Sequence, residues 1–228
     1  MSKSIVRLLD LIFSISAIII FAPILVPIMI VLLLTGEHKI FFMQKRVGIN
    51  GKIFSVYKFA TMLQNSSKMP GGNVTVKNDP RVLPFGKFLR FTKINELPQL
   101  FNVILGNMSL IGVRPVPMDI YKNYPKILRQ KVFSAKPGLS GMGSLMFRDE
   151  ASILNNETNP NDFHKDIISP YKLECDLWYT DQIKISRYIT LIIVTVYSII
   201  FNPNPLSLSN LFKLPSPPHL LINKWKEI

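Results

Sequence analysis

The longest feature of the hydrophobic pattern is an uncharged run near the N-terminus. Residues 11–34 carry only Ser14 and Ser16 as polar interruptions. A straight spanning helix needs about 20 apolar residues. A signal peptide does not fit, because its apolar region is about 7–15 residues long and ends at a small-residue cleavage site. We therefore predict a membrane helix that stays part of the protein.

Two prolines bear on how this segment meets the membrane. Pro23 and Pro27 lie inside the run, where each removes a backbone donor and clashes with the preceding turn. A kinked spanning helix and a re-entrant helix, which breaks and returns to the same side, both account for them. Lys and Arg favour the cytoplasmic side of a membrane, so basic residues at both ends favour the re-entrant form. These flanking residues are Lys3, Arg7, His38, Lys39, Lys45 and Arg46.

Two later segments have amphipathic or apolar character. Residues 188–201 form an apolar stretch that is too short to span a bilayer comfortably. A buried core helix is one interpretation, and a helix in the headgroup layer, flanked by Lys184 and Arg187, is the other. The segment 220–228, LLINKWKEI, is predicted to be a small amphipathic anchor.

The polar and apolar pattern between these segments predicts a compact α/β domain that is mostly helical. Residues 40–43 and 53–57 have the pattern of strands, and the Asn-Gly pair at 50–51 favours a tight hairpin between them. Residues 85–91 and 97–105 are predicted helices, with Gly106 as a stop. The polar, Gly-rich segment 64–79 is a predicted mobile loop. We expect a re-entrant membrane helix over 1–36, the main domain over 37–201 and a Pro-rich tail over 202–228.

Composition changes the expected partner. The net charge of +13 would usually indicate nucleic acid, but 48% of the residues are hydrophobic, which favours a lipid-associated protein. Anionic lipid headgroups and phosphorylated substrates account for the charge equally well. Nucleic acid is therefore not an expected partner. The single cysteine, Cys175, allows no internal disulfide and fits a reducing compartment.

Candidate chemistry lies in polar islands rich in basic residues. One such residue alone is most simply a solvated side chain, but together they supply forks that match phosphate oxygens. Acidic residues are scarce, so Glu96, Asp149, Glu150 and Asp176 are notable as Mg²⁺ ligands, since Mg²⁺ takes one or two carboxylates plus substrate phosphates. No Walker A sequence, GxGxxG, Cys/His metal spacing or Ser/His/Asp pattern is present. The sequence therefore gives little support to a kinase, a Rossmann enzyme or a zinc enzyme.

Several motifs in order resemble the bacterial sugar transferases, the monotopic polyprenol-phosphate phosphoglycosyl transferases. The central part is KINELPQL at 93–100, followed by GNMS at 106–109 and IGVRP at 111–115. Arg7 and Asp10 before the apolar run, DPR at 79–81, PGLSG at 137–141 and Asp176 before Trp178-Tyr179 match the same family. The resemblance runs from about residue 3 to about residue 201.

The resemblance implies a re-entrant helix and a domain on the cytoplasmic face of the bacterial inner membrane. It implies transfer of a sugar-1-phosphate from a UDP-sugar to undecaprenyl phosphate, with Mg²⁺, as the first membrane step of surface polysaccharide or glycoconjugate synthesis. An Asp-Glu pair acts in that family: the Asp attacks the sugar-proximal phosphate, UMP leaves, and polyprenol phosphate collects the phosphosugar. The expected partners are the UDP-sugar, polyprenol phosphate and membrane lipids. The expected site is catalytic Asn95 and Glu96; metal-binding Glu96 and Asp176; and phosphate-binding Lys58, Arg81, Arg90, Arg114 and Arg148.

The sequence departs from the family where the nucleophile should be. Asn95 occupies the Asp position, and a neutral amide has no carboxylate to attack phosphorus. Ala60 stands where the family usually has Lys or Arg, and Val113 replaces a Pro. Three interpretations stay open: Glu96 as nucleophile, direct reaction of the two substrates, or a silent homologue that binds nucleotide sugar or partners an active transferase. A second copy of the chain and a glycosyltransferase are candidate partners, and a basic membrane scaffold is a further alternative.

Overall fold

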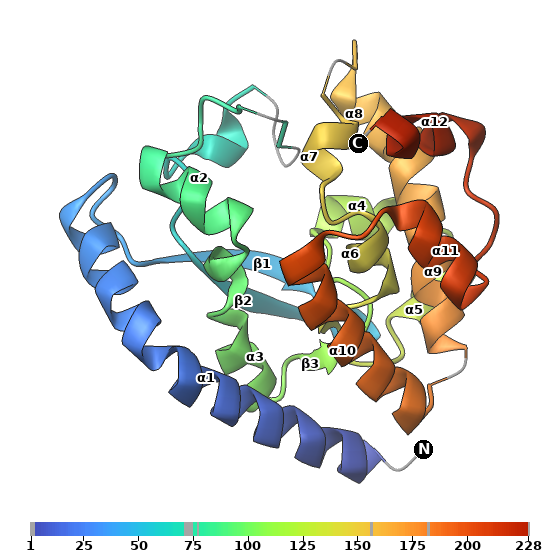
Figure 1. Ribbon diagram of the computed structural model, residues 1–228, viewed down its shortest axis with the longest axis horizontal. Coiled ribbons are helices and arrows are strands. Elements are labelled where there is room, and N and C mark those ends of the chain that lie inside the picture. The colour runs from blue at the N-terminus through green and yellow to red at the C-terminus, as the bar shows by residue number, and fades with distance from the viewer. Residues whose placement is uncertain (1–2, 71–74, 77, 156, 182, 228) are drawn as a thin grey trace.

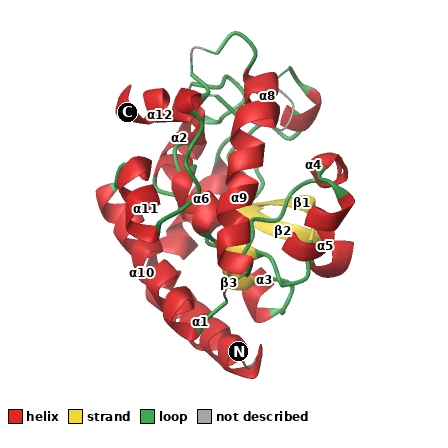
Figure 2. Cartoon of the chain, turned by 90° about the vertical axis from the view of Figure 1, so that its right-hand side faces the viewer, coloured by secondary structure: helices red, strands yellow, loops and turns green. Residues whose placement is uncertain are grey.

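The computed structural model describes residues 3–70, 75–76, 78–155, 157–181 and 183–227. Most of this part is helical, and its named strands form two small two-stranded sheets, as Figures 1 and 2 show. This confirms the predicted mostly helical α/β class. The predicted loop over 64–79 lies partly outside the described residues. The strands are β1 (Phe41–Val47), β2 (Ile53–Phe59), β3 (Ser109–Ile111) and β4 (Gly138–Ser140). The helices are α1 (Lys3–Leu34), α2 (Pro84–Phe91), α3 (Gln99–Ile104), α4 (Met118–Asn123), α5 (Lys126–Val132), α6 (Met142–Met146), α7 (Glu150–Ile153), α8 (Pro160–Phe163), α9 (Ser169–Thr180), α10 (Ile185–Phe201), α11 (Pro205–Phe212) and α12 (His219–Glu227).

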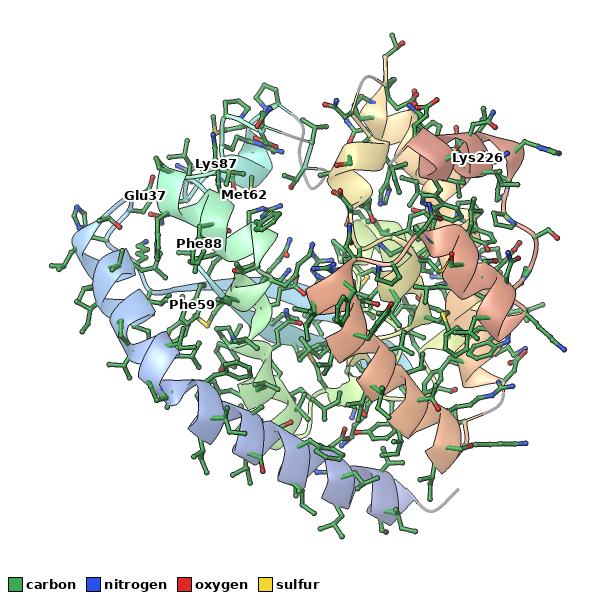
Figure 3. All side chains as sticks on the ribbon, viewed as in Figure 1. Glu37, Phe59, Met62, Lys87, Phe88 and Lys226 are labelled. Carbon is green, nitrogen blue, oxygen red and sulfur yellow. The ribbon has the colours of Figure 1, made fainter. Side chains whose placement is uncertain are left out.

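Helix α1 is continuous and contains both prolines, so the structure does not divide it into two helices. It bends along its length instead, as expected where proline removes a ladder hydrogen bond, and it follows one edge of the molecule (Figure 1). Within the described part of the chain, it is the one helix long and apolar enough to cross a membrane. Many of its apolar side chains project away from the domain (Figure 3).

Both ends of α1 are attached to the rest of the protein. Near its start, Arg7 donates to the carbonyl oxygens of Val103 and Ile104 at 2.5 and 2.6 Å. One turn later, the buried Asp10 accepts hydrogen bonds from the Ser109 and Tyr188 hydroxyls at 2.9 and 2.6 Å. Near its other end, Ile28 and Leu32 are buried in a cluster with Phe59 and Leu89. The helix therefore lies against the domain at both ends rather than leaving it.

The predicted hairpin is confirmed. β1 and β2 pair antiparallel, with Phe41 opposite Phe59 and Val47 opposite Ile53. At the turn, Asn50 and Gly51 have φ values of 53° and 76°. These left-handed conformations suit asparagine and glycine, because their side chains create little or no clash there. The strands are longer than the sequence predicted.

The second sheet fixes the segment that leads to Arg114. β3 and β4 pair parallel, with Ser109 opposite Gly138 and Ile111 opposite Ser140. A Cβ atom on Gly138 would lie 2.1 Å from the backbone nitrogen of Gly112, so only glycine permits this approach. This close packing sets the course of the chain from β3 into Arg114.

The main core extends into the C-terminal helices. Leu208 of α11 and Leu221 and Trp225 of α12 are buried in it, and the Trp225 ring centroid lies 5.6 Å from that of Phe147 and 6.0 Å from that of Tyr171. The segment predicted as a small amphipathic anchor thus turns Leu221 and Trp225 into the protein core.

Helix α10 is buried on one side, as the core-helix interpretation predicts, and its position in the headgroup layer stays a prediction. Tyr188 and Leu191 are buried, while other side chains of the same helix are exposed. The exposed side chains include Ile193, Val196 and Ile200.

Candidate active site

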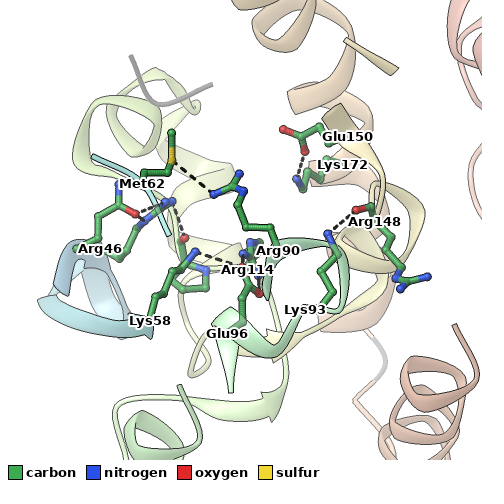
Figure 4. Close-up of polar contacts among 12 residues, drawn as sticks. Arg46, Lys58, Met62, Arg90, Lys93, Glu96, Arg114, Arg148, Glu150 and Lys172 are labelled. Atoms are coloured by element: carbon green, nitrogen blue, oxygen red, sulfur yellow. Dashed lines mark hydrogen bonds and ion pairs between the residues drawn. The ribbon is translucent and has the colours of Figure 1, made fainter. Parts of the chain in front are cut away.

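Glu96 lies at the centre of a cluster of cations. It ends a short 3-10 helix, Ile94–Glu96, which follows Lys93 in a left-handed conformation with φ 61°. Lys58 of β2 places its Nζ atom 3.2 Å from Glu96 Oε1. The Arg114 guanidinium meets both carboxylate oxygens, with NH1 3.1 Å from Oε2 and NH2 on Oε1. Three segments distant in sequence therefore meet at one carboxylate (Figure 4).

Three further cations lie around this carboxylate, and each of them contacts neutral acceptor atoms. Arg46 donates to Gln44 Oε1 at 2.6 Å and to the Pro115 carbonyl at 3.1 Å. Arg90 contacts Met62 Sδ at 3.5 Å, and Lys93 donates to the Arg148 carbonyl at 2.9 Å. These acceptors are neutral, so the cluster keeps a positive excess, which suits a phosphorylated ligand. We call this set the phosphate cluster: Arg46, Lys58, Arg90, Lys93, Glu96 and Arg114.

Burial and charge have opposite effects on the pKa of Glu96. Burial raises that pKa, but the charges of Arg114 and Lys58 and the Arg114 hydrogen bond outweigh it and hold the pKa well below the usual range. Burial lowers the pKa of Lys58 to about 8, against the raising effect of Glu96. At neutral pH Glu96 is therefore an anion held between two cations.

Asn95 occupies a different environment from its neighbour. It is 6% exposed, and its Oδ1 atom is buried with no hydrogen-bond partner among the described residues. A buried amide oxygen without a partner is unusual, because its desolvation is not compensated. Asn95 thus brings no carboxylate to the site and no visible hydrogen bond that fixes it.

Asp176 is bonded to backbone. It is 5% exposed, and its Oδ1 atom accepts a hydrogen bond from Gly143 N at 3.0 Å. A Cβ atom on Gly143 would lie 2.8 Å from Oδ1, so the carboxylate fills the space that a side chain would need. Burial raises the pKa of Asp176 to about 7. Asp176 therefore supports the first turn of α6.

A divalent cation fits Glu96 better than Asp176. No group of three His, Cys, Asp or Glu side chains gathers to hold a metal within the described ranges. Glu96 is an ionised carboxylate among basic side chains, and its role as a ligand of a Mg²⁺ ion shared with substrate phosphates stays a prediction. Asp176 directs its carboxylate to Gly143, and its pairing with Glu96 on one metal stays a prediction.

The predicted phosphate-binding residues separate into two groups. Lys58, Arg90 and Arg114 gather around Glu96, and Arg148 directs its guanidinium away from it (Figure 4). Arg81 is engaged elsewhere as well. Arg81 forms a buried ion pair with Asp79, its NH2 atom 2.6 Å from Oδ2. Arg148 donates through its guanidinium to Ser198 and Asn202, and only its backbone carbonyl reaches Lys93. Phosphate binding stays a prediction for all five residues, and for Arg81 and Arg148 the geometry adds no support to it.

Arg46 and Lys93 belong to the cluster but were not among the residues predicted to bind phosphate. Strand register carries a signal for Arg46: Lys58 lies opposite Phe42, and residues 42, 44 and 46 share one face of β1. Once the hairpin is assigned, Arg46 and Lys58 are therefore expected on the same face. Lys93 offers no comparable signal. Its side chain is positioned by its own left-handed backbone conformation and by the hydrogen bond to the Arg148 carbonyl, which is distant in sequence.

A cationic cluster around one carboxylate, in a chain that also has a long apolar helix, is expected of a membrane-associated protein that handles phosphorylated substrates. The chain belongs to the bacterial sugar transferase family, whose model matches residues 1–202. The structure and this match agree with the resemblance of the motifs.

Three curated relatives illustrate the similarity. The galactosyl transferase CpsE of Streptococcus agalactiae is 39% identical over 118 residues, which are 47% of this chain and 26% of that protein. The undecaprenyl-phosphate galactose phosphotransferase of Salmonella typhimurium is 34% identical over 163 residues, or 65% of this chain and 34% of that protein. The exopolysaccharide production protein PSS of Rhizobium leguminosarum is 34% identical over 145 residues, or 61% and 72% of the two chains. The chain thus spans about a quarter to a third of the first two relatives.

Proposed function

We propose that this protein transfers a sugar-1-phosphate from a UDP-sugar to undecaprenyl phosphate, as a membrane step of polysaccharide or glycoconjugate synthesis. The observation that carries the proposal is the phosphate cluster, in which five cations surround Glu96. Relatives support the substrate class: one from Klebsiella pneumoniae, 38% identical over 146 residues, is named UDP-glucose:undecaprenyl-phosphate glucose-1-phosphate transferase.

The side chains of the cluster bind and orient the diphosphate of the donor. Arg114 meets Glu96 through NH1 and NH2, and its remaining N–H groups donate to phosphate oxygens, while Lys58, Arg90 and Lys93 add charge around the same point. Glu96 would hold Mg²⁺, which when bound neutralises part of the diphosphate charge. These residues lower the barrier by placing positive charge where the transferring phosphoryl group develops negative charge.

We infer that the two substrates react directly. A phosphate oxygen of undecaprenyl phosphate attacks the sugar-proximal phosphorus, the bond from that phosphorus to the UMP oxygen breaks, and UMP leaves with the electron pair. Asn95 lacks a carboxylate for a covalent step, and Glu96 is a weak nucleophile because two cations hold it and lower its pKa. The protein then contributes positioning and electrostatics rather than a covalent intermediate.

A second candidate function rests on Asn95. A neutral, buried side chain at the nucleophile position favours a silent homologue that binds a nucleotide sugar, or that partners an active transferase or a second copy of the chain. Incubation with a panel of UDP-sugars and undecaprenyl phosphate, followed by measurement of UMP, separates the two. Release of UMP supports the transferase, and binding without release supports the silent homologue.

The membrane arrangement is also part of the proposal. We propose that α1 enters the cytoplasmic leaflet of the bacterial inner membrane and returns to the cytoplasmic side, where the domain lies. The attachment of both helix ends to the domain, through Arg7 and Asp10 at one end and Leu32 at the other, supports this over a helix that leaves the domain. The exposed apolar side chains of α10 would lie in the headgroup layer beside it.

A further inference from the structure

A second polar cluster lies outside the phosphate cluster and has no role in the mechanism above. Glu150 of α7 pairs through Oε2 with Lys172 Nζ of α9 at 2.6 Å and through Oε1 with His164 Nε2 at 3.1 Å. The second ring nitrogen of His164 lies 3.2 Å from the Ser169 hydroxyl. We call Glu150, His164 and Lys172 the Glu150 cluster. Its side chains are 27%, 15% and 21% exposed, so a ligand can reach them.

The Glu150 cluster lies beside the phosphate cluster. Lys93 donates to the carbonyl of Arg148, two residues before Glu150, and so joins the two clusters through the backbone. The charge of Glu96 first, and then those of Glu150 and Asp176, raise the pKa of Arg114, which places Glu150 within electrostatic reach of the phosphate-binding guanidinium. Figure 4 shows Glu150 and Lys172 across from Arg90 and Lys93.

The two clusters differ in the chemistry they offer. The phosphate cluster has an excess of cations, whereas the Glu150 cluster combines a carboxylate, an ammonium and an imidazole, which together accept and donate hydrogen bonds. Lys172 Nζ lies 5.6 Å from the centre of the buried Phe147 ring, which supports the lysine from the core side. Sugar hydroxyl groups both donate and accept hydrogen bonds, so they match this pairing of an acceptor with donors, whereas an ionised phosphate offers acceptors.

Resting on the proposed function, we propose that Glu150 and Lys172 bind the hydroxyl groups of the donor sugar and set the preference among UDP-sugars. The sugar is attached to the diphosphate, so a diphosphate on the phosphate cluster brings the sugar to the neighbouring groups. Glu150 accepts from sugar hydroxyls, Lys172 donates to them, and His164 and Phe147 hold these two side chains in place.

The test compares the full-length wild type with Glu150→Gln and Lys172→Met in lipid nanodiscs. Dissociation constants are measured for UDP, UDP-glucose, UDP-galactose and UDP-N-acetylgalactosamine.

Both variants should bind the UDP-sugar that the wild type binds most tightly about 10-fold more weakly, because each removes a charged hydrogen-bonding partner. The differences in affinity among the three UDP-sugars should also become smaller. Affinity for UDP should stay within about two-fold, because UDP carries the diphosphate but not the donor sugar.

Asp181→Asn is the matched control, because it removes a carboxylate from the exposed pair with Lys131, which is 2.7 Å long and 45–50% exposed. It should change none of the affinities. The inference is overturned if wild type binds the UDP-sugars no better than UDP, or if Glu150→Gln weakens UDP and the UDP-sugars by the same factor. Failure of the wild type to bind even UDP would instead refute the proposed function.

Discussion

At the scale of single residues, Asn95 separates an active from a silent protein. Glu96 and its cations are in place, but position 95 has no carboxylate to act as the nucleophile of the family. We expect Asn95→Asp to raise UMP release from UDP-sugar and to allow a phosphosugar adduct on the enzyme, since it supplies the carboxylate that acts as nucleophile in the family. UMP assay and intact mass after addition of UDP-sugar without acceptor measure the two effects.

Asn95→Leu is the control for this gain, because it keeps a similar volume and adds no carboxylate; it should form no adduct. The double variant Asn95→Asp/Ala60→Lys should gain further, since it restores a basic residue at a position where the family usually has one. An adduct on Glu96 in the wild type would contradict direct transfer. Absence of turnover in the wild type, in Asn95→Asp and in the double variant, with nucleotide sugar still bound, would leave the silent homologue.

Lys58 predicts a pH dependence of ligand binding. Its pKa is lowered to about 8, so it loses its charge as the pH rises through that value. Binding of UDP, measured by calorimetry without added divalent cation, should weaken by about 10-fold between pH 7 and pH 9, because a charged hydrogen bond to phosphate is lost.

A loss of stability at high pH does not account for the expected decline in UDP binding. The unfolded lysine has a pKa near 10.4, so between pH 8 and 10 the unfolded state binds more protons and the Lys58 contribution to stability rises with pH. Lys58→Arg should keep UDP binding nearly constant over the same range, since a guanidinium stays charged. A decline of equal size in Lys58→Arg would show that another group titrates.

At the scale of structural elements, the turn into α6 depends on Asp176. Its folded pKa of about 7 lies above the unfolded value near 3.9, so the folded state holds the extra proton between these values. The contribution to stability is therefore complete below pH 4 and is lost as the pH rises through 7. The free energy of unfolding should fall by about 2–3 kcal/mol between pH 5 and pH 8.

Asp176→Asn tests this assignment, because an amide keeps the oxygen that accepts from Gly143 N and has no charge to titrate. Denaturant unfolding of the variant should show a flatter dependence on pH over that range. Gly143→Ala should destabilise the protein at every pH by about 1–3 kcal/mol, because its Cβ would overlap the carboxylate. A wild type whose stability does not change between pH 5 and 8 would refute the raised pKa.

Elements encoded by local signals could be predicted from the sequence, and contacts between distant segments could not. Asn50-Gly51 gave the hairpin, and Gly106, with φ 85°, ends α3 as its position indicated. The Glu96, Lys58 and Arg114 cluster could be proposed from the motifs. The Arg81–Asp79 pair, the Asp176–Gly143 bond and the burial of Trp225 depend on packing between separate elements, which no local pattern encodes.

At the scale of the whole molecule, the attachment of both ends of α1 predicts the same side for residue 4 and the domain. The only cysteine of the sequence, Cys175, is 0% exposed, so background labelling is low. In intact cells, an impermeant thiol reagent should leave Ser4→Cys and Lys39→Cys unlabelled, and it should label both in inverted membrane vesicles.

Ile20→Cys provides the internal reference for this experiment. Ile20 is 68% exposed in the protein, but lipid should cover it in the membrane. The reagent should therefore label it in neither preparation, and only after detergent is added. Labelling of Ser4→Cys from outside the cell, with Lys39→Cys still protected, would show that α1 crosses the bilayer.

The packing of Trp225 against Phe147 and Tyr171 has a consequence for protein engineering. The family match ends at residue 202, whereas the aromatic support beneath Lys172 and α7 includes a residue 23 positions later. A chimaera joined at residue 202 would keep the phosphate cluster and would replace the Trp225 that packs against Phe147 and Tyr171 with a residue of another protein. If Glu150 and Lys172 bind the donor sugar as proposed, exchanging the donor sugar between relatives therefore requires moving α11 and α12 together with these residues.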